Sequence, residues 1–180
     1  VTQSPLHATG PCWPVRAALI GSWWLLREAE LGNLRRQHAT IRGDVVTLHL
    51  PASKSDQGGS GTSRSLRCTC SVTAKDVCPL HLVKAQLEFA AHMSARHGIS
   101  DSDAPLFPAG DGGAVSKAGV CATIVAIAKR LGLELWDASG APKFTGHTLR
   151  VTGAIHLAKR GIDVWRIQLH GRWGSDAVLR

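Results

Sequence analysis

The segment Thr145-Gly146-His147-Thr148-Leu149-Arg150 predicts the start of a helix that carries two cationic side chains. His147 and Arg150 are three residues apart, so both project from one side of the first turn. The free N–H groups and positive dipole of a helix N-terminus favour a phosphate and disfavour cations, unless an anion is bound. Arginine can bind two phosphate oxygens at once. The segment therefore indicates a phosphate-binding site, the alternative being a helix start with incidental polar residues.

Outward from this segment, the chain is mainly helical with one small antiparallel β-hairpin inserted. The expected helices cover 14–34 (in two parts, the second a short helix over 28–34, with the passage between the parts loosened at Gly21 or Ser22), 79–96, 116–131, 147–160 and 163–170, and another begins at Ser175. The β-branched run Val45–Leu50 is the clearest strand. A Gly-rich tip at 58–61 and a second strand at 64–68 complete the hairpin.

Composition narrows the class of partner. With 180 residues, 44% hydrophobic, the chain is expected to form one domain over 14–180, preceded by a linker or frayed edge at 1–13. No apolar run approaches the roughly 20 residues of a membrane span, and the odd number of cysteines favours a reducing, intracellular compartment. Lys plus Arg is 21 against 13 acidic residues, a net charge of +8 that favours nucleic acid over a membrane surface. The chain contains no tyrosine.

Two further segments place charged residues in suggestive positions. Arg27 and Glu30 lie at the junction of two apolar helices, where the carboxylate can hold the guanidinium; the alternative is a surface ion pair that contributes little. Lys54 lies on the hairpin, from which it could reach a bound phosphodiester and give a proton to a leaving oxygen. The alternative for Lys54 is a solvated surface lysine.

The order of these motifs resembles a known family. The residues that carry the resemblance are Arg27-x-x-Glu30-Leu31, the hairpin Lys54, His147-x-x-Arg150 and Gly171-Arg172-Trp173-Gly174-Ser175-Asp176-Ala177-x-Leu179-Arg180. Together they resemble the catalytic domain of tyrosine recombinases (phage-integrase type), in particular the divergent versions of eukaryotic mobile elements. The resemblance covers about residues 14–180. It implies a DNA breaking-rejoining fold that acts on double-stranded DNA as an oligomer, without a cofactor for catalysis, and in the nucleus if the source is eukaryotic.

The resemblance also implies a role for each matched residue. Arg27 and Arg150 would clamp the non-bridging oxygens of the scissile phosphate, and His147 would hydrogen-bond the phosphate and assist proton transfer. Lys54 would serve as general acid for the departing 5′ oxygen. Glu30 matches an acid that orients the other groups.

The last motif and the nucleophile depart from the common pattern. Where many members have Leu-Gly-His, this chain offers Trp173 to pack on the phosphate, with Arg172 and His170 as alternatives. Leu25-Leu26 stands where many have Thr-Gly-Leu. The nucleophilic tyrosine would directly follow Arg180, so the chain is expected to stop just short of it.

A second group of residues predicts a metal site. Cys68-x-Cys70, Cys78 and His81 could bind a structural zinc ion that ties the return strand of the hairpin to the next helix, the alternative being free cysteines. Two other functions remain open at this point. One is a catalytically inactive DNA-binding relic of a mobile element, and the other is a zinc-stabilised interaction module.

Overall fold

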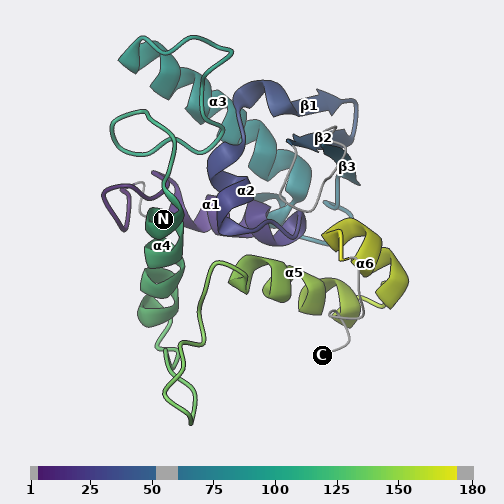
Figure 1. The fold of residues 1–180 in the computed structure, drawn as a ribbon. Coiled ribbons are helices and arrows are strands. Elements are labelled where there is room, and N and C mark those ends of the chain that lie inside the picture. The colour runs from purple at the N-terminus through teal and green to yellow at the C-terminus, as the bar shows by residue number, and fades with distance from the viewer. Residues whose placement is uncertain (1–3, 52–60, 174–180) are drawn as a thin grey trace.

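The computed structural model describes residues 4–51 and 61–173, and its architecture is mainly helical with one small antiparallel sheet (Figure 1). Lys54 and the helix predicted from Ser175 lie outside the described residues. The elements are α1 (Pro14–Trp23), α2 (Glu28–Asn33), η1 (Arg36–His38), β1 (Ala39–Arg42), β2 (Val45–Leu50), β3 (Thr62–Arg67), η2 (Lys75–Val77), α3 (Pro79–His97), α4 (Lys117–Arg130), α5 (Thr148–Lys159) and α6 (Val164–Gly171). The predicted fold class is confirmed.

Helix α1 is the centre of the domain, because it packs against α3, α4 and α5 (Figure 1). Two glycines let α5 approach it closely. A Cβ on Gly153 would lie 2.0 Å from the carbonyl oxygen of Ser22, and one on Gly21 would lie 2.6 Å from Cδ1 of Leu149. The prediction that Gly21 or Ser22 loosens the passage between the two N-terminal helices is wrong, since both lie within α1. Gly21 instead makes room for the neighbouring helix.

The sheet contains a strand that the sequence did not predict. Its order is β1-β2-β3, with both pairs antiparallel, and β1 pairs Ile41 with Val46. Strand β1 has only four residues, too few for an alternating pattern to stand out. On β3, Arg64 lies opposite Leu48, on the inward face of the sheet. This face packs against α3.

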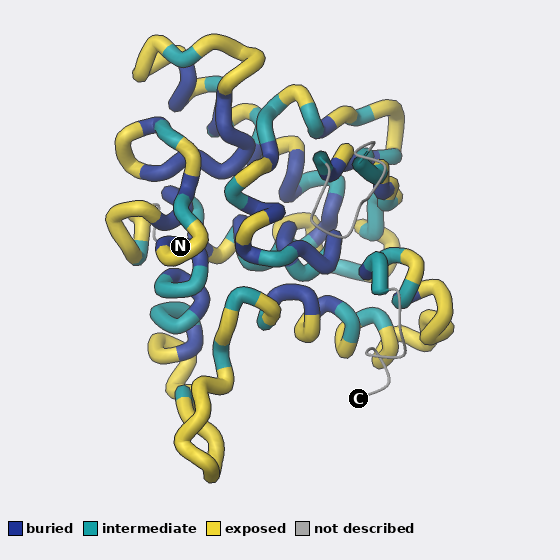
Figure 2. Tube along the Cα trace, viewed as in Figure 1, coloured by how far each residue is buried: buried dark blue, intermediate teal, exposed yellow. Residues whose placement is uncertain are grey.

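The core fills the space between the sheet and the helices (Figure 2). It includes the fully buried Ile20 and Trp24 of the α1 region, and Phe107 from a loop. Residues 4–13 form no helix or strand, but Gly10–Cys12 are buried, and the N–H of Cys12 donates to the carbonyl of Pro108 at 3.0 Å. Among the described helices, none combines the length and apolar character that a membrane crossing requires.

Candidate functional site

The C-terminal end of α1 collects three nitrogen-bearing side chains from different parts of the chain. The carbonyls of residues 23–25 accept, in order, hydrogen bonds from His170 Nε2 (2.9 Å), Arg64 Nη1, and Arg150 Nε (2.8 Å). Carbonyls at a helix C-terminus lack intrahelical partners and carry the negative end of the helix dipole. This end of α1 therefore forms a backbone platform that fixes the two arginines from one side.

A turn in an unusual conformation shapes the platform. Leu25 has φ of 51°, in the left-handed region that residues other than glycine rarely adopt. The turn closes with a bond from the N–H of Leu26 to the carbonyl of Gly21 (2.8 Å), and the Leu25 side chain is fully buried. As a result, Arg27 is extended and immediately precedes α2.

Glu30 is the acidic centre of the site. Its Oε2 accepts from the backbone N–H of Arg27 (2.8 Å) and from Arg150 Nη2 (3.1 Å), while its Oε1 accepts from Arg172 Nη2 (3.1 Å). Glu30 is only 8% exposed and Arg150 only 2%. One buried carboxylate therefore orients guanidinium groups that come from the last two helical segments.

Positive charge exceeds negative charge in the cluster that surrounds Glu30, which contains Arg27, Arg64, Arg150 and Arg172. Burial lowers the pKa of Arg64 to about 9; the charge of Glu30 opposes this shift, while Arg172, Arg150 and Arg27 add to it. Burial also lowers the pKa of Arg150, again against the attraction of Glu30. Among the described residues, Arg64 Nε and Nη2 and Arg150 Nη1 are buried and have no hydrogen-bond acceptor. Buried donors with excess positive charge favour an anionic ligand.

Residues of the last motif, Arg172 and Trp173, pack against this cluster. The Trp173 ring lies 5.5 Å from Cζ of Arg150, within range of a cation–π contact. A Cβ on Gly171 would come within 2.1 Å of the Trp173 ring, so glycine is needed for this arrangement. Burial lowers the pKa of His170, although its bond to the carbonyl of Trp23 opposes the shift. The three residues considered for the last motif thus all reach the site: His170 contacts the carbonyl of Trp23, Arg172 contacts Glu30, and Trp173 contacts Arg150.

His147 lies at the edge of the site. It precedes the first residue of α5, one position before the predicted helical turn, and its side chain is exposed. Gly146 joins it to α2, since its carbonyl accepts from the N–H of Glu28 at 3.2 Å. Within the described part of the chain, the His147 ring makes no hydrogen bond or ion pair, so its predicted phosphate contact stays a prediction.

Arg64 is a site residue that the sequence reasoning missed. A signal was present: Leu66 points inward, so Arg64, two residues before it on the same strand, must share its face, while Ser63 and Ser65 point outward. A charged residue at an inward strand position is rare unless it has a specific role.

We expect Arg64→Met to maintain or raise thermal stability and to weaken the binding of an anionic ligand, for which duplex DNA serves as the probe. Methionine fills a similar volume and removes a buried charge that desolvation and the neighbouring arginines disfavour, although it also removes the donor to the carbonyl of Trp24. Thermal unfolding and filter binding to duplex DNA, each measured on both proteins, test the two parts. Equal DNA affinity of the two proteins would contradict a role for Arg64 in anion binding.

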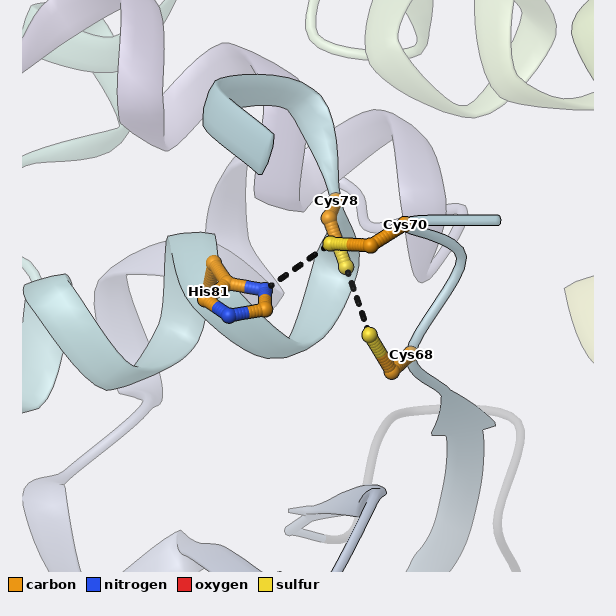
Figure 3. A group of neighbouring side chains, drawn as sticks. All are labelled: Cys68, Cys70, Cys78 and His81. Carbon is orange, nitrogen blue, oxygen red and sulfur yellow. Dashed lines mark hydrogen bonds between the residues drawn. The ribbon is translucent and has the colours of Figure 1, made fainter. Parts of the chain in front are cut away.

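The predicted zinc ligands also come together. Ligand atoms of Cys68, Cys70, Cys78 and His81 all lie within 4.8 Å of one another (Figure 3). Burial alone would raise the pKa of Cys78, but hydrogen bonds involving His81 and Thr69 lower it to about 5.

Comparison with known proteins gives a likeness in structure alone. No family model and no curated protein sequence matches the chain. It is similar to a solved structure of the XerH site-specific recombinase bound to difH substrate, with a TM-score of 0.65 and 17% identity over 90% of this chain and 40% of that one. It is also similar to XerA recombinase (TM-score 0.61, 16% identity, 92% of this chain and 56% of that one).

A third similar structure is the Tn1549 transposon integrase in complex with circular intermediate DNA, with a TM-score of 0.56, 16% identity, and coverage of 89% of this chain and 50% of that one. The chain thus spans roughly half the length, or less, of these structures. The arrangement of its helices and sheet is the fold of a tyrosine recombinase catalytic domain.

Proposed function

We propose that this chain is the DNA-binding catalytic domain of a site-specific recombinase or integrase, and that the cluster around Glu30 holds one phosphodiester of duplex DNA. The observation that carries the proposal is the pair of buried arginines, Arg64 and Arg150. Both are fixed by backbone carbonyls at the end of α1, and both keep unused donors among the described residues. The net charge of +8 supports a polyanionic partner.

The similar structures support the same class of ligand. The XerH structure is bound to its difH substrate and the Tn1549 integrase structure contains DNA. The family resemblance of the motifs, and not these structures, adds the proposals that the protein acts on DNA as an oligomer and, if its source is eukaryotic, in the nucleus. The resemblance of its motifs to tyrosine recombinases adds the type of reaction.

In the proposed reaction, a tyrosine hydroxyl attacks the phosphorus and passes its proton to His147, while the bond to the 5′ oxygen breaks. The products are a 3′-phosphotyrosyl bond and a free 5′ hydroxyl, whose proton comes from the general acid proposed at Lys54. The arginines stabilise the negative charge that develops on the non-bridging oxygens, a contribution that is often the largest in catalysis. Attack by the 5′ hydroxyl of a partner strand reverses the step, so the bond energy is retained and no cofactor is required.

A covalent DNA adduct is the test of this proposal. The nucleophile must lie outside the 180 residues, because they contain no tyrosine. The protein extended beyond Arg180 is mixed with a pool of nicked duplexes of randomised sequence, in which the short fragment that carries the new 5′ hydroxyl diffuses away after cleavage. We expect a DNA-linked protein band that survives denaturation, with the link mapped to a tyrosine by mass spectrometry.

Two other results would overturn all or part of the proposal. Salt-sensitive duplex binding without an adduct would indicate the DNA-binding relic and remove the catalytic part. Absence of both binding and adduct would remove the proposal altogether. The same binding assay run at two salt concentrations verifies that phosphates supply the contact, because each neutralised phosphate makes the affinity more dependent on salt.

A further inference from the structure

A cluster of three cysteines and one histidine lies outside the arginine site. Cys68 directly follows β3, Cys70 lies in the next loop, Cys78 immediately precedes α3, and His81 is in the first turn of α3. Figure 3 shows the four side chains pointing toward one another from these two segments. The chain therefore brings both groups of ligands to one place through its fold rather than through a single short motif.

The distances fit one tetrahedral ion. With Zn–S bonds of about 2.3 Å and Zn–N bonds of about 2.1 Å, a tetrahedral site separates two sulfurs by about 3.8 Å and a sulfur from a nitrogen by about 3.6 Å. Sγ of Cys78 lies 3.7 Å from Sγ of Cys68, and Sγ of Cys70 lies 3.4 Å from Nδ1 of His81. All four ligand atoms lie within 4.8 Å of one another, so they can surround a single ion.

The surroundings favour thiolates over a disulfide. The 3.7 Å between Cys68 and Cys78 is far longer than the roughly 2.05 Å of an S–S bond. The backbone N–H of Thr69 donates to Sγ of Cys78 at 3.3 Å, the kind of outer hydrogen bond that orients metal-bound ligands. Three thiolates with one imidazole are ligands that zinc prefers.

We propose that Cys68, Cys70, Cys78 and Nδ1 of His81 bind one Zn²⁺ ion in a closed, structural site. Four protein ligands leave no open position for water or substrate, which separates structural zinc sites from catalytic ones. The ion joins the edge strand β3 to the start of α3. It thereby closes the loop that contains η2.

This loop also contacts the backbone platform at the C-terminal end of α1. Nε1 of Trp23 donates to the carbonyl of Val77, in η2, at 2.9 Å, and the carbonyl of Trp23 itself accepts from His170. Strand β3 carries Arg64 as well. A zinc ion at the end of β3 therefore restrains two elements that position the arginine cluster, without touching that cluster.

Zinc content of the purified protein is the first test. We expect one zinc per chain by elemental mass spectrometry when purification avoids chelators, and cobalt substitution should give the visible absorption of a tetrahedral thiolate site. Cys78→Ser should lose most of the metal. Cys121→Ser is the matched control, since Cys121 lies on α4 outside the cluster, and it should retain one zinc.

Two more variants keep the test decisive if Cys78→Ser does not fold. Cys70 is exposed, so Cys70→Ser should fold and still bind zinc more weakly, whereas Cys70→His exchanges one zinc ligand for another and should retain the ion. A strong chelator should lower the Tm by about 10 °C, reversibly on adding zinc. The proposal is overturned by wild-type protein that neither contains nor takes up zinc, by a Cys68–Cys78 disulfide in mass spectrometry, or by full zinc content in Cys70→Ser and Cys78→Ser.

Discussion

Replacing Arg150 with alanine is expected to slow covalent adduct formation by about 1000-fold, the loss typical of removing one preorganised donor from a charged transition state. Nε of Arg150 is held by the carbonyl of Leu25 and Nη2 by Glu30, which leaves Nη1 for a phosphate oxygen. The measurement is the single-turnover rate of adduct formation on a nicked duplex, in protein extended beyond Arg180. Arg150→Lys should recover little of the rate, because an ammonium group cannot be held by both partners and still bind the phosphate.

Arg42→Ala provides the control for net charge. Arg42 ends β1 and is exposed, so its removal lowers the charge of the protein by the same amount without altering the cluster. We expect its adduct rate to remain within about twofold of wild type. Equal losses in Arg42→Ala and Arg150→Ala would mean that overall charge, and not the fixed guanidinium, determines activity. An undiminished rate in Arg150→Ala would remove Arg150 from the phosphate site.

Much of the fold could be predicted because its signals are local. Pro14 at the first turn of α1, Gly98 after α3 and Ser116 before α4 mark helix ends, and Ser116 Oγ accepts from the N–H of Gly119 as a helix cap should. Glu30 was expected to hold the Arg27 guanidinium, but in the described residues its carboxylate accepts from the Arg27 backbone N–H. Its main partners are nevertheless Arg150 and Arg172, which lie more than a hundred residues away along the chain.

The geometry of the arginine cluster could not be predicted, because it depends on contacts that the pattern of side chains in the sequence does not show. The acceptors that fix Arg64 and Arg150 are backbone carbonyls, which are the same in every residue. They become available only because α1 ends at Trp23 and the chain then turns at Leu25, in a left-handed conformation that no propensity would assign to a leucine. Gly21 illustrates the same limit, since a glycine that permits helix packing and one that breaks a helix look alike in sequence.

Glu30→Gln should lower the free energy of unfolding by about 3 kcal/mol, because it removes one partner of a buried ion pair and leaves the others uncompensated. Glutamine keeps the shape and can still accept from Arg27 N–H, so the loss reports the charge. Glu28→Gln is a matched control on the same helix: Glu28 is equally buried, but its ion pair is with the exposed Lys117, at 3.3 Å. We expect that variant to change the free energy of unfolding by less than about 1 kcal/mol. Urea unfolding of both variants provides the comparison.

A double-mutant cycle separates the carboxylate's role in holding arginines from its role in the fold. If Glu30 acts mainly by neutralising the cluster, then Arg150→Met should remove much of the need for it. Glu30→Gln should accordingly lower the free energy of unfolding less in the Arg150→Met background than in wild type, by a difference of at least about 1 kcal/mol. Such a coupling is expected only for groups in contact. Additive losses would show that the charge of Glu30 acts independently of Arg150, through its other guanidinium partner, Arg172. Arg150 would then be fixed chiefly by the carbonyl of Leu25, and its charge would remain available to a phosphate.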